Sequence, residues 1–521
     1  MEITDSMFFL TWAGVSALIA AIFSVTVSAR DRAKKRPSAI VEIFESESTH
    51  SVDSDDYPGD FNRGEDPFDD SSVDYDPYDI ELIPEGGYAG LLTHTPQKLL
   101  TQGEPHCSSF DNALHALLHS SDNLLITGPA GTGKSTLLRE FRRKFSGTMA
   151  ILAPTGLAAF TIGGATIHRF FGFPLNVEAL KSSFNQPKKK ELYEHIDVFV
   201  IDEASMLNSA MLTAIDNTLR NTLGAPSKPF GGKRIVLIGD VLQLPPIVKS
   251  EYLELYNRRF GGVFFFQSQS FESGDFHRLR LNQIFRNLNE QESALLNRFR
   301  VGTYHNTDLE ILNSRVSDVG VRSNELRLVL KKDTAHRINS LRLSELPSKE
   351  GQYIAAIHGK HTDFDLPCDH KLVLKRDARV IFIANDAQNR WQNGTLGHAI
   401  AASDQYITVR TDEGVTYQVE RYTWTQVELM YDRQTNTVKE QIVGSVTQFP
   451  LKLAWALTVH KAQGQTVERA IIDFQGQAWA SGQAYVAISR TRSLDGMTLA
   501  RPLTKSDFIY DPALMAFEYG Q

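Results

Sequence analysis

Cysteine is nearly absent from this chain of 521 residues. Its two cysteines, Cys107 and Cys368, are far apart, and neither stands in the spacing of a metal-ligand motif. A secreted domain held together by a disulfide framework is therefore excluded. The pattern instead indicates a reduced protein facing the cytosol, and the length predicts several domains with large buried cores.

An overall excess of basic residues is also lacking, because the formal net charge is −8. Residues 37–90 carry 16 acidic residues and one basic residue, whereas residues 1–36 carry three acidic and five basic. Residues 91–521 are therefore left with a net charge of +5. That value lacks the strong bias of many nucleic-acid modules, so any nucleic acid must be held by local charge in a groove. No internal repeats are apparent.

One long uncharged run is present near the N-terminus, the 21 residues of 7–27. As a helix this run reaches about 30 Å, the thickness of a bilayer core. Five basic residues follow it directly, and by the positive-inside rule they keep the C-terminal side in the cytoplasm. We therefore expect a single-pass anchor in a lipid bilayer, most simply a bacterial inner membrane. A cleaved signal or a misassigned start codon are the alternatives.

The segment that follows is acidic and rich in Ser, Pro, Gly and Tyr, with little apolar periodicity. Such a segment cannot bury enough apolar surface to offset its ordering entropy, and we expect a disordered tether. Its rms span would be about 40 Å. It would act as a plain spacer, or it could compete with nucleic acid for a basic groove.

Residues 128–135 read GPAGTGKS, the G-x-x-x-x-G-K-[ST] pattern. An apolar run precedes this loop and a helix-favouring stretch follows, which is the strand–loop–helix context that a phosphate-binding loop needs. A structural Gly-rich turn is the alternative. The phosphate cradle is predicted to be Gly128, Pro129, Ala130, Gly131, Thr132, Gly133, Lys134, Ser135 and Thr136. Lys134 would reach the β- and γ-phosphates of ATP, and Ser135 would help to hold Mg²⁺.

Two further buried-strand patterns end in polar residues. IDVFVIDE ends in Asp202, placed to hold Mg²⁺, and Glu203, placed to orient the attacking water. RIVLIGDVLQLPP runs into Asp240 and Gln243, and the Gln is placed to sense a γ-phosphate. An exposed acid pair and a Pro-terminated strand are the structural alternatives.

These segments belong to a series that resembles the PIF-type helicases of superfamily 1, which are relatives of RecD. The resemblance is closer to bacterial members of the family than to eukaryotic ones. The matching segments are GPAGTGKST, APTGLAAFTIGGATIHRFFGFP, IDEASMLNSAMLTAIDNTLR, PFGGKRIVLIGDVLQLPP, LNQIFRN, LKLAWALTVHKAQGQT and GQAYVAISRTRS. They run in family order over about four-fifths of the chain. The resemblance implies an α/β fold with two RecA-like parallel-sheet P-loop domains, and a small β-barrel insertion that is Src-homology-3-like.

The alternation of strand and helix patterns agrees with this fold, because it predicts parallel sheets with sites at the strand ends. A segment with the sequence pattern of β-strands interrupts the second domain. The predicted organisation is a tail at 1–6, a transmembrane helix at 7–27, a basic flank and acidic linker at 28–94, a first domain at 95–302, a second domain at 303–368 and 446–510, a β-rich insertion at 369–445, and a C-terminal tail at 511–521.

The resemblance also assigns residues that composition alone does not. It implies that Arg286 and Arg490 come from the second domain to meet charge on the γ-phosphate, a task suited to a planar guanidinium. The residues implied to hold single-stranded DNA are Thr155, Thr166, His168, Thr458, His460, Lys461 and Gln463. Such groups can contact phosphate and sugar without reading bases, although capping of their own loops is the alternative. Phe170 and Phe171 could stack on bases or belong to the core.

The chain departs from the family upstream of the phosphate loop, where Phe110 or Asp111 stands near the position of a Gln that recognises adenine.

The overall prediction is an ATP-dependent DNA helicase moving 5′ to 3′ on single-stranded or forked DNA. Family members act in repair, recombination or replication and on telomere-type or G-quadruplex DNA. A membrane-tethered ATPase that translocates on or senses DNA without productive unwinding is the alternative, and a tether with a vestigial ATPase is the third.

Overall fold

The computed structural model describes residues 106–174, 185–285, 289–320, 323–359 and 366–519. All of them lie in one compact unit, Val73–Gln521. The predicted membrane span, the acidic linker and Arg286 lie outside the described residues. Within those ranges, no helix combines the length and the apolar character that a bilayer crossing requires.

Short apolar runs build a first sheet of seven parallel strands. In spatial order these are β1 (His106–Ser108), β7 (His277–Leu281), β2 (Leu124–Thr127), β6 (Arg234–Ile238), β5 (Val198–Ile201), β3 (Met149–Ala153) and β4 (Ala165–Thr166). Neighbouring residues of β2, Leu125 and Ile126, enter two different core clusters, one on each face of the sheet. This double burial explains why the strands are continuous hydrophobic runs rather than alternating ones.

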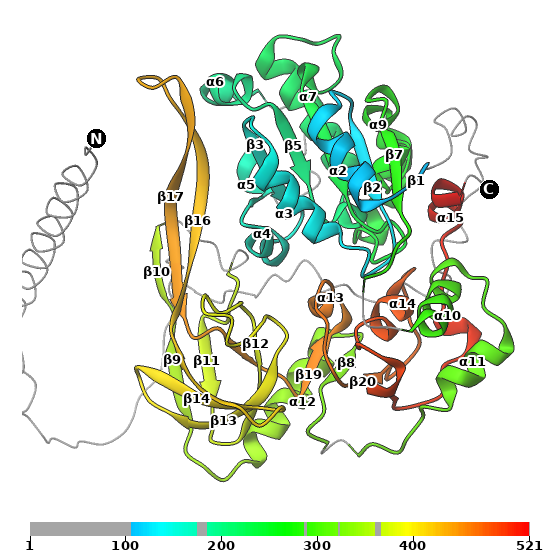
Figure 1. The fold of residues 1–521 in the computed structure, drawn as a ribbon, viewed down its shortest axis with the longest axis vertical. Coiled ribbons are helices and arrows are strands. Elements are labelled where there is room, and N and C mark those ends of the chain that lie inside the picture. The colour runs from blue at the N-terminus through cyan, green and yellow to red at the C-terminus, as the bar shows by residue number, and fades with distance from the viewer. Residues whose placement is uncertain (1–105, 175–184, 286–288, 321–322, 360–365, 520–521) are drawn as a thin grey trace, which may run out of the picture. The chain divides into compact units, whose positions relative to one another are not determined.

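Helices cover both faces of this sheet, and sheet and helices together are the first lobe (Figure 1). One face is covered by α2 (Phe110–His119) and α3 (Lys134–Lys144). The other is covered by α5 (Ile167–Phe171), α6 (Lys190–Glu194), α7 (Ser209–Leu223), α8 (Leu253–Phe260) and α9 (Gln269–Ser273). A further helix, α4 (Gly156–Ile162), follows β3.

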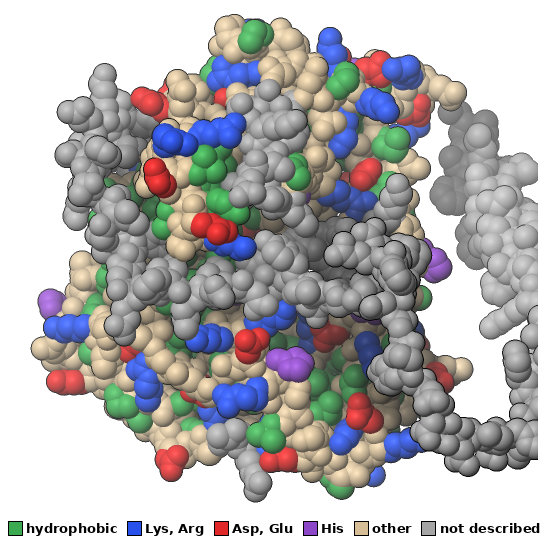
Figure 2. Space-filling view, turned by 180° about the vertical axis from the view of Figure 1, so that it is seen from behind, with side chains coloured by type: hydrophobic (Ala, Val, Ile, Leu, Met, Phe, Trp, Pro, Cys, Tyr) green, Lys and Arg blue, Asp and Glu red, His purple; other side chains and the backbone are tan. Residues whose placement is uncertain are grey.

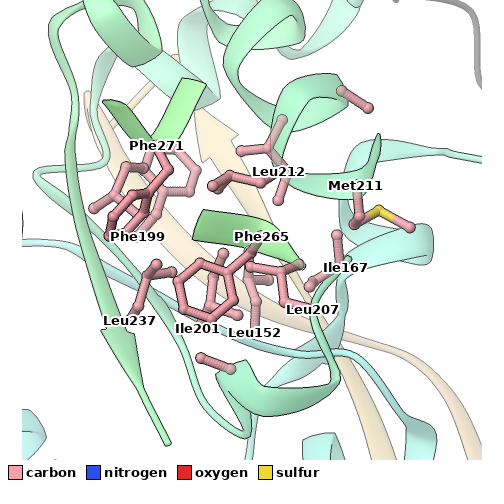
Figure 3. Packing of buried hydrophobic residues seen from close by; sticks show 14 of the residues in the cluster. Leu152, Ile167, Phe199, Ile201, Leu207, Met211, Leu212, Leu237, Phe265 and Phe271 are labelled. Atoms are coloured by element: carbon pink, nitrogen blue, oxygen red, sulfur yellow. The ribbon is translucent and has the colours of Figure 1, made fainter. Parts of the chain in front are cut away.

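The longest of these helices, α7, has a capping residue at each end. The side chain of Asn208 accepts the Met211 N–H at its start, and Gly224 ends it with a φ of 67°. Its buried residues, among them Leu212, pack against Phe199 and Leu237 of the sheet (Figure 3).

A second, four-stranded parallel sheet forms the second lobe. Its strands are β19 (Ala456–Thr458), β8 (Arg327–Val329), β20 (Ala470–Asp473) and β21 (Met497–Leu499), and its helices are α10 (Glu290–Val301), α11 (Asn306–Asn313), α12 (Lys332–Glu345), α13 (Val459–Ala462) and α14 (Gln483–Ile488). Leu295, Leu296 and Phe299 of α10 share a core with this sheet. The second lobe therefore includes α10, which lies before the predicted start at residue 303.

Antiparallel sheets occupy the chain between α12 and β19. Their strands are β9 (Gly351–Ile354), β10 (Ala356–Gly359), β11 (Lys371–Leu374), β12 (Ala378–Phe382), β13 (Leu396–Ala402), β14 (Tyr406–Thr411), β15 (Thr416–Glu420), β16 (Tyr422–Asp432), β17 (Thr437–Gln448) and β18 (Leu451–Leu453). The β-rich region thus begins at Gly351 and ends at Leu453, and it is wider than the predicted 369–445.

The longest hairpin of this region, β16–β17, reaches back to the first lobe (Figure 1). Arg169 Nε lies 3.0 Å from Glu428 Oε1, and the Tyr431 ring stacks on His195 with centroids 4.2 Å apart. Partly buried Leu429 and Tyr431 also pack against the first-lobe core. The hairpin therefore adds a second connection between the two lobes, through apolar contact more than through exposed ion pairs.

On the face that Figure 2 shows, the Lys and Arg side chains of the described residues are spread among Asp and Glu. This distribution agrees with the modest net charge calculated for residues 91–521.

Candidate functional site

The loop between β2 and α3 has the backbone geometry of a phosphate cradle. Gly128, Gly131 and Gly133 all have positive φ, at 151°, 87° and 82°. A Cβ on Gly128 would lie 2.5 Å from the Leu281 carbonyl oxygen, so only glycine fits there. The loop thereby turns its N–H groups inward at the N-terminus of α3, where phosphate oxygens bind well.

Lys134, the first residue of α3, folds its ammonium back over this loop. Its Nζ donates to the Gly128 and Pro129 carbonyls at 2.6 and 2.9 Å. Burial lowers the pKa of Lys134, while Asp240 and Glu203 act in the opposite direction. The lysine is thus a charge surrounded by carboxylates, placed to move onto a phosphate. Ser135 and Thr136 are exposed just beyond it.

Two acids follow β5, and they differ in environment. Asp202 is buried, and burial together with the neighbouring Glu203 raises its pKa to about 7. Glu203 has a φ of 51°, a left-handed conformation that non-glycine residues rarely adopt. Strain of this kind is often concentrated at functional sites.

This pair suits a divalent cation. A buried carboxylate whose ionised form is disfavoured by a like charge gains from an added cation, and Mg²⁺ prefers oxygen ligands. Asp202 and Ser135 are the predicted ligands, and the burial of Asp202 supports that assignment. The pairing of these two residues around one cation stays a prediction.

Asp240 and Gln243 lie just beyond β6 and hold each other. Gln243 Nε2 donates to Asp240 Oδ2 at 3.1 Å, and Arg300 Nη2 lies 2.6 Å from Asp240 Oδ1. Burial alone would raise the pKa of Asp240, but Arg300 and Lys134 outweigh burial and lower it. Asp240 therefore remains an anion that fixes the Gln243 amide.

The second lobe touches the two ends of this site. Gln463, predicted to bind DNA, donates from Nε2 to Glu203 Oε2 at 3.1 Å. Tyr485 Oη accepts the backbone N–H of Ala130 at 3.2 Å. Tyr485 lies in the segment GQAYVAISRTRS but is not among the predicted site residues. Both contacts connect the phosphate chemistry directly to the second lobe.

A glycine makes the close approach possible. Gly482, which precedes α14, has a φ of 73°, and a Cβ there would lie 2.5 Å from the Leu242 carbonyl and 2.7 Å from the Gln243 carbonyl. The backbones of the two lobes are therefore in van der Waals contact at Gln243.

Arg490, the predicted γ-phosphate arginine within the described residues, is held by its own lobe. Its Nε donates to the Val486 carbonyl at 2.7 Å, and its Nη1 donates to the Gln465 carbonyl at 3.2 Å. The guanidinium is buried beside α14. Its contact with nucleotide stays a prediction, and so does that of Arg286.

Two of the three predicted DNA residues of the first lobe line a pocket. Thr155 and His168 lie in its wall, and the remaining lining residues are Pro154, Ile167, Met206, Leu207, Asn208, Met211, Pro246 and Ile247. Thr155 also caps α4 by accepting the Ala158 N–H, and Thr166 caps α5 by accepting the Arg169 N–H. Capping, the structural alternative for both threonines, is therefore present, and their DNA contacts stay predictions.

The second-lobe set is arranged around α13. Thr458 caps this helix by accepting the Lys461 N–H, and the His460 ring stacks on Trp479 with centroids 5.9 Å apart. Lys461 is exposed. The DNA contacts of these residues stay predictions too.

Phe170 and Phe171 belong to the core and are both buried in the first-lobe cluster. Of the two alternatives left open by the sequence, the structure favours packing over base stacking, because their faces contact Tyr193 and Phe199.

An exposed aromatic lies instead beside the phosphate loop. Phe285 donates its N–H to the Gly131 carbonyl at 2.9 Å, and the residue is 54% exposed. Phe110 meets it edge-on, with centroids 6.4 Å apart. Such a face suits stacking on a nucleobase, a contact that tolerates any base. Sequence reasoning missed Phe285, although its place in LNQIFRN next to Arg286 was a usable signal.

Comparison with known proteins gives consistent results. The profile of the PIF1-like helicase family matches residues 107–318. The ATP-dependent DNA helicase Pif1 of Bdellovibrio bacteriovorus is 33% identical over 411 residues, which cover 77% of this chain and 89% of that protein. The crystal structure of Bacteroides sp Pif1 in complex with ADP-AlF4 has a TM-score of 0.73 at 33% identity, covering 79% of this chain and 96% of that one. The crystal structure of Bacteroides Pif1 bound to ssDNA has a TM-score of 0.58 at 34% identity, covering 81% of this chain and 97% of that one.

Proposed function

The chain belongs to the family of PIF1-like helicases, and we propose that it couples ATP hydrolysis to movement along DNA through direct contacts between its two lobes. It is an ATP-dependent DNA helicase, as its relatives are. The direction of movement, 5′ to 3′ on single-stranded DNA, and work in repair, recombination, replication or G-quadruplex maintenance are our proposals from that kinship.

The observation that carries the coupling is the Gln463–Glu203 hydrogen bond. Glu203 is the residue placed to orient water for hydrolysis, whereas Gln463 follows directly on α13, which carries His460 and Lys461. A change at the γ-phosphate therefore reaches the predicted DNA-holding segment through one hydrogen bond. Tyr485 on Ala130 gives a second route, from the phosphate loop to α14.

The residues of this chain divide the task. Lys134 and the loop amides bind phosphate, Asp202 and Ser135 would hold Mg²⁺, and Glu203 would hold the attacking water. When bound, Mg²⁺ supplies neutralising charge for the phosphate oxygens. Arg490 would leave the carbonyls that now hold it and complete the site from the second lobe.

The first test is ATP turnover by the full chain with and without a single-stranded DNA oligonucleotide. We expect DNA to raise turnover severalfold, because DNA held beside α13 would position Gln463 against Glu203, the residue placed to orient the attacking water. Lys134→Ala should turn over no ATP under either condition, and an RNA oligonucleotide of the same sequence reports selectivity. Turnover that is unchanged by DNA would contradict the proposed coupling.

Strand displacement separates this proposal from the alternative of an ATPase that senses or translocates on DNA. On a forked duplex we expect the wild-type chain to displace the strand, and the Lys134→Ala chain to leave it annealed. DNA-stimulated turnover without displacement would favour the alternative.

We also propose that residues 7–27 anchor the motor to the cytoplasmic side of a membrane. The proposal is supported by the absence of charge over 21 residues and by the basic cluster that follows. The full chain should sediment with membranes and resist extraction by salt, and a chain that starts at residue 37 should not. Recovery of the full chain wholly in the soluble fraction would reject the anchor.

A further inference from the structure

The last helix of the chain, α15 (Pro512–Tyr519), is part of the first lobe (Figure 1). It belongs to the segment that the sequence analysis named a C-terminal tail. Phe517 stacks on Phe266 with centroids 4.0 Å apart and planes 5° from parallel, and the Arg278 guanidinium lies 3.9 Å from the centre of the Phe517 ring. Because the preceding segment folds with the second lobe, α15 crosses from one lobe to the other.

This helix carries a carboxylate into the interior. Glu518 is fully buried, and its Oε1 lies 3.0 Å from Arg300 Nη2 and 3.5 Å from Arg280 Nε. Its Oε2 accepts the Thr127 hydroxyl at 3.4 Å. Thr127 is the last residue of β2, immediately before the phosphate loop. A buried carboxylate with two cations is a costly feature, and it persists where the geometry is well satisfied.

The Arg300 guanidinium continues the contact toward the nucleotide. The same Nη2 lies 2.6 Å from Asp240 Oδ1, and Asp240 Oδ2 accepts the Gln243 amide at 3.1 Å. Four side chains thus form an unbroken line from the end of the chain to the residue placed to sense the γ-phosphate. Burial would lower the pKa of Arg300, but Asp240 and Glu518 outweigh burial and raise it well above its usual value.

The charges explain why both carboxylates are needed. Arg300 lies between Asp240 and Glu518, and it also lies close enough to Lys134 to disfavour the charged form of that lysine. Without the Glu518 charge, only Asp240 would neutralise Arg300, while Lys134 would also attract the Asp240 carboxylate. Asp240 would then shift toward the two cations, and its hold on the Gln243 amide would change.

We propose that Glu518 is a positioning residue for ATP hydrolysis, acting through Arg300 and Asp240 to fix the Gln243 amide at the nucleotide. The proposal rests on the function proposed above and deepens it. It assigns to the C-terminal helix a part in the chemistry, in addition to its packing.

The test compares Glu518→Gln and Glu518→Asp with wild type in the full chain, with Glu468→Gln as the matched control. Glu468 is an exposed acid that pairs with exposed Arg492 at 2.7 Å, so its substitution removes an ion pair of the same chemistry at the surface. The readouts are kcat and KM for ATP with saturating single-stranded DNA, DNA affinity without nucleotide, and the melting temperature.

An interaction realised only in the transition state should lower kcat and kcat/KM equally, so we expect Glu518→Gln to lose about tenfold in kcat with KM within about twofold. Glu518→Asp keeps the charge and should be intermediate, while Glu468→Gln should match wild type. DNA affinity should not change, because the line of contacts ends at the nucleotide.

If Glu518→Gln keeps the wild-type kcat while the wild-type chain shows DNA-stimulated turnover, this inference is overturned and the proposed function is not. The inference would also be overturned if kcat falls only because less of the protein is folded. Glu518→Asp, which retains the buried charge, tests for this outcome. If the wild-type chain lacks DNA-stimulated turnover, the proposed function and this inference fail together.

Discussion

A Glu203→Gln chain should bind ATP and single-stranded DNA but hydrolyse ATP about a hundredfold to ten-thousandfold more slowly, the range for loss of a general base. The amide has the shape of the carboxylate, and its oxygen can still accept the Gln463 N–H that now bonds to Glu203 Oε2. The contact between the lobes is therefore kept, and only the basic oxygen is lost. Steady-state ATP turnover with DNA present measures the effect, and a fluorescent ATP analogue checks binding.

The control for this variant is Glu254→Gln, the same change at an exposed acid of the first lobe. It should behave as wild type. Turnover that survives in Glu203→Gln would show that another group orients the water, and the site would need a different base.

An Asp202→Asn chain should lose at least about a hundredfold in ATP turnover, because the charge predicted to hold Mg²⁺ is removed. Its folded state should nevertheless gain stability at pH 8. The pKa of Asp202 is raised from 3.8 to about 7, so between these values the unfolded chain releases a proton that the folded chain keeps. The resulting penalty is complete above pH 7 and absent below about pH 4.

Removing the ionisable group removes that penalty, which we place at roughly 2–4 kcal/mol at pH 8. Thermal melts in EDTA at pH 8 and pH 4 measure it: the variant should melt higher at pH 8 and together with wild type at pH 4. Asp404→Asn, at an exposed position, should shift neither melt. Equal melting of Asp202→Asn and wild type at pH 8 would show that Asp202 is ionised without cost.

The parts of this fold that depend on local pattern could be predicted from sequence. Buried runs such as VFVI and RIVLI form the central strands β5 and β6, and the glycines of 128–135 adopt the positive φ that the predicted loop requires. These features need only the period of a strand and the φ that glycine allows, which neighbouring residues determine.

The parts that depend on distant partners could not be predicted. In the sequence, Arg300 looks like any charged residue on the exposed face of a helix. Only the tertiary structure places it on Asp240, 60 residues away in sequence. The eight residues of α15 are too few to show a helical period that would indicate docking. The β-rich region extends beyond its predicted bounds for a related reason, since β9 pairs with β11 and β10 pairs with β17, and these partners are distant in sequence.

The position of α15 has a consequence for how the protein is made. Leu514 and Phe517 complete a hydrophobic cluster whose aromatic members Phe266 and Phe271 are translated hundreds of residues earlier. A ribosome shields the residues that it has added most recently, so this cluster stays incomplete until Phe517 has left the exit tunnel. Chains that stall or end prematurely before Phe517 would leave Phe266 and Phe271 uncovered, as a ready marker for quality-control proteases.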